Sequence, residues 1–272
     1  MNLSPDLGDP KPRYEYYAGL TSAPGGCCNE PMEFLKIAPA RTSVAQRVLY
    51  MEGYNIWDGK GSLAQRAGNF SLLEEAAMCL GQCSCAVVGQ AGTNWVHCTG
   101  TTPDEIDDII AEISEKAQTK FYMAGHSLVR ALREIGAKKI AVANGYYRPE
   151  WRDGINRYLE QAGFEILTSG NIVDYGLFKS YDEIEQLERA TLWDYPMKDI
   201  LDCLVAAHEA APDADVVVQT GAGMRTLDIL EVAEAATGKM MVCSDNALYW
   251  DMLRGLGAKG PQTGYGALLK SA

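Results

Sequence analysis

The sequence lacks the marks of several protein classes. It has no apolar run near the roughly 20 residues that cross a bilayer, and residues 1–17 hold no basic stretch followed by an apolar one, as a signal peptide would. Only three histidines occur, none in a zinc-ligand pattern, and no basic cluster offsets the net charge of −12. We therefore expect a cytoplasmic protein with no bound metal and no membrane or nucleic-acid partner.

Cysteine is abundant, but its spacing indicates no disulfide framework. The eight cysteines are irregularly placed and accompany no export signal, so we expect reduced thiols. The chain has 272 residues, of which 47% are hydrophobic and 22% charged, as in globular proteins with one large core or two smaller ones. Residues 1–13 include three prolines and predict a flexible tail.

Strand-like segments alternate with amphipathic helical segments along the chain. We predict strands at residues 15–24, 41–51, 85–91, 137–144, 164–173, 213–220 and 239–245. We predict helices at residues 71–83, 102–117, 127–136, 148–163, 196–211, 224–238 and 246–257. Alternation with short loops is typical of α/β proteins, in which helices cover both faces of parallel sheets.

Two of the predicted strands end in nearly the same six residues. VVGQAG occupies residues 87–92 and VVVQTG occupies residues 216–221, so four of six positions are identical and Gly92 aligns with Gly221. Ligands of parallel α/β folds bind beyond the carboxyl ends of strands, where bare backbone can offer N–H groups to an anion. Tight turns at the two glycines are the alternative interpretation. The repeat favours two related halves that face one site.

Several stretches together resemble the aspartate/glutamate racemase superfamily, and most closely arylmalonate decarboxylase and maleate isomerase. They are APGG (23–26), AGTNWVHCTG (91–100), and the segments at residues 127–147, 209–232, 244–257 and 264–269. The resemblance implies two pseudo-symmetric halves, each a four-stranded parallel sheet flanked by helices, with the active site in the cleft between them. It places residues 14–120 and 240–272 in the first half and residues 121–239 in the second.

The resemblance also implies a site that lacks its usual thiols. Racemases and maleate isomerases of this superfamily carry cysteine at both positions held here by Gly92 and Gly221. Arylmalonate decarboxylase carries only the second, which protonates an enediolate after carbon dioxide leaves. The carboxylate-binding positions are better retained, although Asn94 stands where a hydroxyl residue is common. The resemblance assigns substrate binding to Gly92, Thr93, Asn94, Tyr146, Gly221, Ala222 and Gly223.

Other side chains are candidates for the missing proton donor. Cys27 and Cys28 follow the glycines of the first loop, where a thiol with a lowered pKa can serve as acid or nucleophile. His97 lies just beyond the first glycine loop, and histidine is suited to proton transfer near neutral pH. Inert buried cysteines and a histidine that points away are the alternatives. His126 and Asp245 are further candidates, for which capping or packing is an equally good explanation.

The expected function follows from this combination. We expect an enzyme, a carbon–carbon lyase without a cofactor that resembles arylmalonate decarboxylase and acts on a small malonate-like carboxylate through an enediolate in a dioxyanion hole. Alternatives are an isomerase or racemase of the maleate isomerase type, a lyase or hydrolase that uses water, and a carboxylate-binding protein without catalysis. The expected partner is the small carboxylate, and the sequence is compatible with a homo-oligomer.

Overall fold

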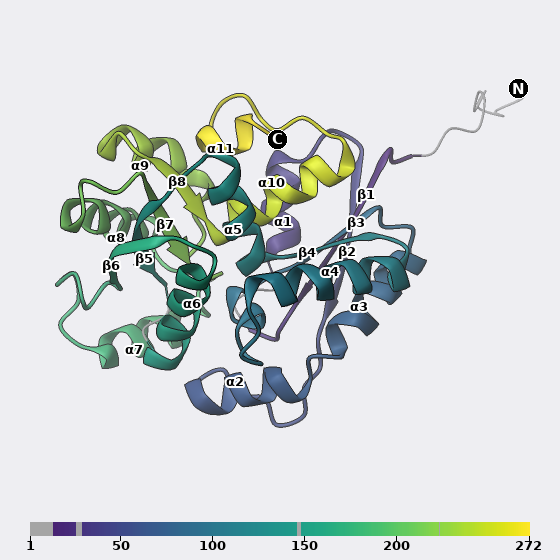
Figure 1. Cartoon of the computed structure of the whole chain (residues 1–272), viewed down its shortest axis with the longest axis horizontal. Coiled ribbons are helices and arrows are strands. Elements are labelled where there is room, and N and C mark those ends of the chain that lie inside the picture. The colour runs from purple at the N-terminus through teal and green to yellow at the C-terminus, as the bar shows by residue number, and fades with distance from the viewer. Residues whose placement is uncertain (1–12, 26–28, 146–147, 223) are drawn as a thin grey trace, which may run out of the picture.

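The computed structural model describes residues 13–25, 29–145, 148–222 and 224–272, and within them eight strands form two parallel sheets (Figure 1). The first sheet has the order β2-β1-β3-β4, with β1 (Tyr16–Ser22), β2 (Thr42–Val48), β3 (Val87–Gln90) and β4 (Lys120–Met123). The second has the order β6-β5-β7-β8, with β5 (Lys139–Asn144), β6 (Glu165–Gly170), β7 (Val216–Thr220) and β8 (Met240–Cys243). The predicted α/β fold with two four-stranded halves is confirmed.

Helices flank both sheets, and short 3-10 turns follow β3 and precede one helix of the second half. In the first half they are α1 (Glu30–Ile37), α2 (Gly59–Gly68), α3 (Leu72–Gln82), η1 (Thr93–Val96) and α4 (Pro103–Ala117). The remaining helices are α5 (Ala124–Glu134), α6 (Pro149–Gln161), α7 (Tyr181–Thr191), α8 (Met197–Ala210), η2 (Leu227–Ile229), α9 (Leu230–Thr237), α10 (Ser244–Leu256) and α11 (Gly266–Lys270). None of these described helices is both long and apolar enough to cross a membrane.

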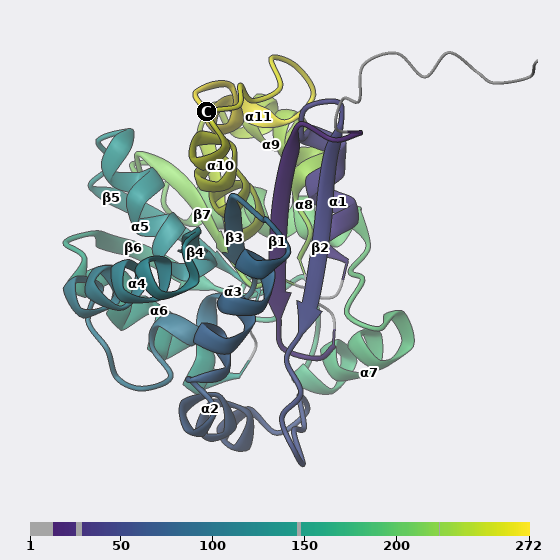
Figure 2. The ribbon, with the colours of Figure 1, turned by 90° about the vertical axis from the view of Figure 1, so that its right-hand side faces the viewer.

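The two halves have the same strand order, so β3 and β7 occupy equivalent central positions. Figure 1 shows the first sheet at the right and the second at the left. Every residue of β3 and β7 is buried, because helices pack against both faces of a parallel sheet. Around the first sheet, α1 packs against β2, α3 against β1 and β3, and α10 against β3 and β4 (Figure 2). The repeated sequence therefore ends at matching places in the two halves.

The chain crosses between the halves at the last strand of each sheet. The helix α10 follows β8 of the second sheet but packs against α5 and against β3 of the first. Close contact explains Gly89 in β3, since an added Cβ would lie 2.5 Å from Met252 Sδ of α10. By contrast, α11 packs against β8 and α9 of the second half. Strand pairing puts β4 in the first sheet and β8 in the second. We therefore propose that the boundaries between the halves lie after Met123 and Cys243. These positions are a few residues beyond the boundaries expected at 120 and 240.

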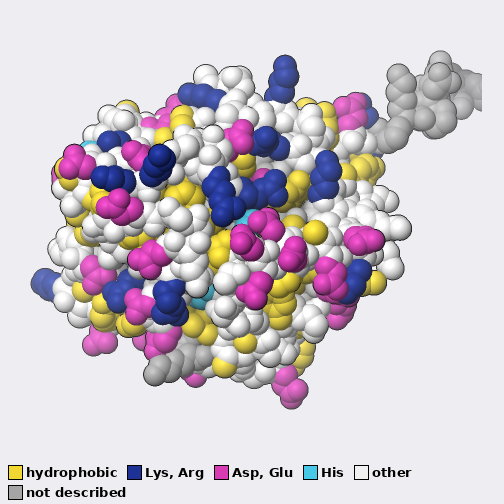
Figure 3. All heavy atoms as spheres, viewed as in Figure 1, with side chains coloured by type: hydrophobic (Ala, Val, Ile, Leu, Met, Phe, Trp, Pro, Cys, Tyr) yellow, Lys and Arg dark blue, Asp and Glu magenta, His cyan; other side chains and the backbone are white. Residues whose placement is uncertain are grey.

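The structure differs from the predicted elements mainly in short segments. The strand β4, four residues between α4 and α5, was not predicted. The helices α1, α2, α7 and α11 were also missed, and the helix expected from residue 224 begins as a loop and the turn η2. The expected tail falls almost wholly outside the described residues. On the face shown in Figure 3, acidic and basic side chains are interspersed.

Candidate active site

Each repeated strand ends in a glycine that has a positive backbone φ. Gly92 has a φ of 92° and Gly221 a φ of 115°, both in the range that side chains other than glycine rarely adopt. The loop after β7 is also crowded, because an added Cβ at Gly221 would lie 3.1 Å from Gly145 Cα. The backbone conformation and the close packing therefore explain why position 221 of the second repeat is a glycine.

A buried glutamine holds each of these loops in place. Gln90 Nε2 donates to the backbone carbonyls of Ala91 and Gly92, the latter at 2.9 Å. Gln219 Nε2 donates in the same way to Thr220 and Gly221, at 2.9 and 2.8 Å. Both glutamines are fully buried. We call the pair of hydrogen bonds from each glutamine to its loop a glutamine clamp. The same glutamine stands in both repeats of the sequence, but its role was not recognised from the sequence.

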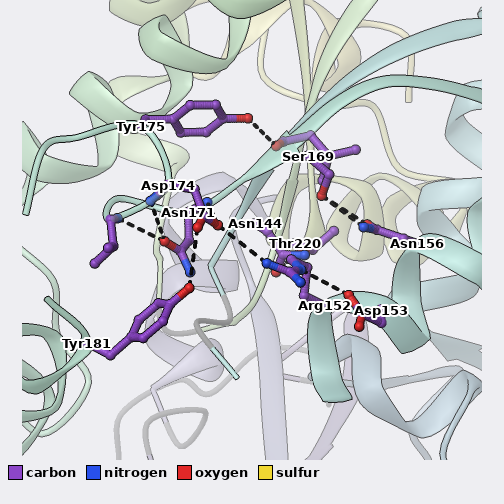
Figure 4. Close-up of polar contacts among 12 residues, drawn as sticks. Asn144, Arg152, Asp153, Asn156, Ser169, Asn171, Asp174, Tyr175, Tyr181 and Thr220 are labelled. Atoms are coloured by element: carbon purple, nitrogen blue, oxygen red, sulfur yellow. Dashed lines mark hydrogen bonds and ion pairs between the residues drawn. The ribbon is translucent and has the colours of Figure 1, made fainter. Parts of the chain in front are cut away.

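The second loop is further fixed by polar contacts at the carboxyl edge of the second sheet (Figure 4). Thr220 Oγ1 donates to Asn144 Oδ1 at 3.0 Å, which joins the ends of β7 and β5. Gly145 N donates to the Thr220 carbonyl at 2.6 Å. In the same view, Asn171 Oδ1 accepts from the backbone of Asp174 at 3.0 Å. The ends of β5 and β7 are thus held against each other at Asn144, Gly145 and Thr220.

A pocket lies between the two glycine loops. All the space in it that atoms do not fill, open solvent included, amounts to about 340 Å³, whereas the volume open to the centre of a water-sized sphere is about 10 Å³. Its lining combines the first loop, the second loop and the N-terminal turns of three helices, namely Glu30, Glu33, Ala91, Gly92, Ala124, Ala222, Arg225, Ser244, Asp245, Leu248 and Tyr249. Convergent polar groups at the carboxyl ends of parallel strands are the expected setting for a ligand site. The predicted pairing of the two repeats around one site agrees with this geometry.

Glu30, the first residue of α1, is the most unusual group in this pocket. Its side chain is buried, and Oε2 has no hydrogen-bond partner within the described residues. Burial raises the pKa of Glu30 to about 8, against the opposing effects of its own backbone N–H and of Arg225. The carboxyl group is therefore largely protonated at neutral pH. Sequence reasoning missed Glu30, because its environment is created by tertiary packing.

The raised pKa of Glu30 predicts a loss of stability toward alkaline pH. The unfolded chain ionises Glu30 near pH 4.5 and the folded chain only near pH 8. Between these values the unfolded state gains from ionisation first, so the free energy of unfolding should fall by up to about 1.4 kcal/mol per pH unit. Urea unfolding at several pH values should show that Glu30→Gln loses this part of the slope. Parallel curves for the two proteins would contradict the shift.

Asp245 lines the pocket, and both of its carboxylate oxygens accept hydrogen bonds from neighbouring residues of the pocket wall. Its Oδ2 accepts from Thr226 N at 2.7 Å, and its Oδ1 accepts from Thr226 Oγ1 at 2.6 Å and from Asn246 N at 2.7 Å. Burial raises the pKa of Asp245, although these hydrogen bonds act in the opposite direction. The carboxylate joins the loop after β7 to the first turn of α10. The helix begins at Ser244, earlier than the sequence suggested, and its N-cap is Cys243, so Asp245 is not the N-cap but a residue of the first turn.

His97 lies outside the residues that line the pocket. It packs against α6, where an added Cβ at Gly154 would lie 2.4 Å from His97 Nδ1, and its Nε2 is 3.3 Å from Asn94 Oδ1. Burial lowers the pKa of His97 to about 3, helped by the charges of Arg157 and Arg66. The imidazole is therefore neutral at physiological pH and a weak base. The structure places this catalytic candidate beside Asn94, behind the first glycine loop and outside the described pocket lining.

His126 is likewise a buried structural group. Its Nδ1 is 2.8 Å from Tyr158 Oη and its Nε2 is 2.8 Å from Asp107 Oδ1, so it joins α5 to α6 and α4. Burial lowers the pKa of His126 in spite of the nearby Asp107 carboxylate. These contacts account for its position, and they give it no access to the pocket lining.

The remaining predicted site residues divide into three groups. Gly92 and Ala222 line the pocket. Thr93 and Asn94 are buried in η1 directly beyond Gly92, and Gly221 directly precedes Ala222. Outside the described residues fall Cys27, Cys28, Tyr146 and Gly223. The described part of the pocket lining contains no cysteine, and the described residues form no cluster of three side chains suited to a metal ion.

Comparisons with known proteins agree with this fold. The family model of arylmalonate decarboxylase matches residues 70–269, well over half of the chain. The arylmalonate decarboxylase of Bordetella bronchiseptica is 31% identical over 148 residues, which are 52% of this chain and 54% of that protein, so the match spans about half of the relative.

Two solved structures share the architecture over nearly their whole length. Unliganded arylmalonate decarboxylase has a TM-score of 0.71 at 19% identity, over 95% of this chain and 100% of that one. A maleate cis-trans isomerase of Nocardia farcinica, with a covalently bound succinylcysteine intermediate, has a TM-score of 0.72 at 19% identity, over 94% and 99%. The family match and the two-sheet fold with its repeated glycine loops together place this chain in the arylmalonate decarboxylase family.

Proposed function

We propose that this chain is an enzyme that decarboxylates a small malonate-like dicarboxylate in the pocket between the two glycine loops. The observation that carries the proposal is the pairing of Gly92 and Ala222 across that pocket, with each loop held by its own glutamine clamp. Family membership supports a decarboxylase or an isomerase. In the proposed reaction the backbone of the two loops would bind the carboxylate that stays on the substrate, while the other carboxylate leaves as carbon dioxide.

The proposed reaction uses the loops as a preformed oxyanion site. Backbone N–H groups at Gly92, Thr93 and Ala222 would bind the carboxylate that stays on the substrate. When the bond to the other carboxylate breaks, its electron pair moves into the retained group and forms an enediolate. Hydrogen-bond donors that are already in place stabilise this charge, and one well-placed donor contributes about 3 kcal/mol in other enzymes. The clamps keep these donors fixed without reorganisation.

Arg225 is the positive group in the pocket lining, and we propose that it attracts the dianionic substrate. Replacing it with glutamine should raise KM by about 10- to 100-fold while changing kcat much less, because a charge-assisted contact to the bound substrate is lost. Steady-state kinetics with methylphenylmalonate would measure both constants. Since Arg225 also pairs with Asp194 at 3.3 Å, Asp194→Asn is the matched control and should keep KM near that of the wild type. An unchanged KM in Arg225→Gln would remove Arg225 from substrate binding.

Isomerisation of a maleate-like substrate is the second candidate. The Nocardia farcinica relative was captured with a succinylcysteine, so a thiol at the substrate is the feature to look for. No cysteine lies in the described pocket lining, whereas Cys27 and Cys28 are outside the described residues. Isomerase activity would therefore depend on one of these two thiols. It should disappear in Cys27→Ala or Cys28→Ala, and decarboxylation should not.

The test of the proposed function is a substrate panel with the purified chain. Phenylmalonate, methylphenylmalonate, butylmalonate and maleate would be incubated separately, and released carbon dioxide and fumarate would be quantified. Carbon dioxide from one malonate, saturating with its concentration, is the expected result. Thermal stabilisation by a malonate without any product would instead indicate a carboxylate-binding protein.

A further inference from the structure

The glycine loops of the pocket provide no proton donor for the proposed reaction. An enediolate must receive a proton at carbon. The described residues directly after β3 and β7 that line the pocket are Ala91, Gly92 and Ala222, and none of them has an acidic side chain. Cys27 and Cys28 lie outside the described residues, so among the described residues a donor is sought on another element of the pocket wall. The acidic side chains in that wall are Glu30 and Glu33 of α1 and Asp245 of α10.

Two of these three carboxyl groups are already engaged. Glu33 forms an ion pair with Lys36 Nζ at 3.0 Å. Both oxygens of Asp245 accept short hydrogen bonds from Thr226 and Asn246. Glu30 differs, because its Oε2 is buried without a partner in the described part of the chain. A buried unpaired carboxyl oxygen is costly and calls for an explanation.

The surroundings of Glu30 keep its proton available. Across the pocket it faces Asp245 and Tyr249 of α10 and Arg225 of the loop after β7, and Glu33 lies one turn away on its own helix. Asp245 and Glu33 disfavour ionisation of Glu30, and burial disfavours it most, whereas Arg225 favours it. Tyr249 Oη donates to the Glu30 backbone carbonyl at 3.4 Å, so it fixes the first turn of α1. The result is a neutral acid that opens onto the space beside Gly92 and Ala222.

We propose that Glu30 is the catalytic acid that protonates the enediolate carbon, since no thiol stands at the positions of Gly92 and Gly221. The inference rests on the proposed decarboxylation. After the carbon–carbon bond breaks and carbon dioxide leaves, the enediolate returns its electron pair to the α-carbon. A carbon–hydrogen bond forms there as the Glu30 O–H bond breaks. Glu30 is left as a carboxylate and regains a proton from water before the next turnover.

The experiment compares Glu30→Gln with the wild type in two reactions followed by proton NMR in deuterated buffer. The first is decarboxylation of methylphenylmalonate to α-phenylpropionate. The second is exchange of the α-proton of α-phenylpropionate for deuterium, which requires proton transfer but no loss of carbon dioxide. Glu30→Gln should lower kcat and the exchange rate by at least about 100-fold, the usual contribution of a general acid. Glu30→Asp should recover part of both rates.

The pH profile separates a catalytic acid from a structural residue. In the wild type, kcat/KM should fall as pH rises through about 8, because the proton on Glu30 of the free enzyme is then lost. That fall should be absent from the residual activity of Glu30→Gln. Asp251→Asn is the matched control, since Asp251 is also a buried carboxyl with a raised pKa, bonded to Ser127 outside the pocket lining. It should retain the wild-type pH profile and most of kcat.

Each outcome has a distinct meaning. Decarboxylation by the wild type that persists in Glu30→Gln, with an unmoved pH profile, would overturn the role of Glu30 and leave the proposed function intact. Exchange by the wild type that depends on Glu30, without decarboxylation of any malonate, would support the acid and overturn the proposed function. If the folded wild type shows neither reaction, both proposals fail.

Discussion

Gly221→Ala should destabilise the protein by about 2–4 kcal/mol and abolish most activity. The reason is twofold. A side chain at this position must adopt a φ of 115°, and its Cβ must fit 3.1 Å from Gly145 Cα. Gly145 cannot easily retreat, because its N–H donates to the Thr220 carbonyl at 2.6 Å. Urea unfolding gives the change in free energy, and decarboxylation of methylphenylmalonate gives the change in kcat.

Gly238→Ala is the control that isolates the backbone contribution. Gly238 also has a positive φ, 67°, but an added Cβ there would have no atom within 4 Å. It caps the C-terminus of α9, so its replacement should cost about 1 kcal/mol and leave activity unchanged. Equal losses of stability in the two variants would show that crowding at Gly221 is unimportant. The same strain applies to Gly221→Cys, so we expect a thiol restored at this position to be poorly tolerated.

Gln219→Leu should lower the free energy of unfolding by about 2–4 kcal/mol. It should also lower kcat, and the corresponding rise in activation free energy should be at least as large as the loss of stability. The leucine fills a similar volume but leaves the buried carbonyls of Thr220 and Gly221 without their donor. The loop that carries Ala222 is then free to turn its peptide groups away from the pocket. Unfolding curves and steady-state kinetics would measure the two effects separately.

Two further variants test whether the clamps act as described. Gln262→Leu removes a glutamine that is exposed and donates to the Gly260 carbonyl at 3.1 Å, so it should change stability little. Gln90→Leu should have nearly the effect of Gln219→Leu, and the double variant should show an additive loss of stability because the two loops belong to different sheets. If Gln219→Leu keeps full stability and activity, the clamp has no functional role.

The sequence contained enough information for the architecture and for the position of the site. The period of the strands and helices predicted parallel sheets covered by helices, and the repeat VVGQAG and VVVQTG located both loops that border the pocket. Such signals are local, because they depend on which side of each segment is buried. The division into two four-stranded halves was implied by the resemblance to the superfamily. The four-residue strand β4 was not predicted; it lies between α4 and α5 and runs directly into α5.

The chemistry within the site was less accessible from the sequence. His97 was selected for its nearness in sequence to Gly92, but Gly154 of α6 leaves a space into which the imidazole packs. Glu30 carries no motif, and its raised pKa arises from burial beside Asp245 and Glu33 after the two halves come together. A side chain's desolvation is a property of the assembled fold, so one sequence cannot reveal it.

The most direct test of the central claim is proton NMR of the wild-type chain with methylphenylmalonate in deuterated buffer. The account predicts loss of one carboxylate and an α-phenylpropionate whose methyl signal is no longer split by an α-proton, because deuterium from the exchangeable acid has entered at that carbon. Persistence of methylphenylmalonate and of the other malonates with the folded protein, or conversion of maleate to fumarate alone, would contradict it.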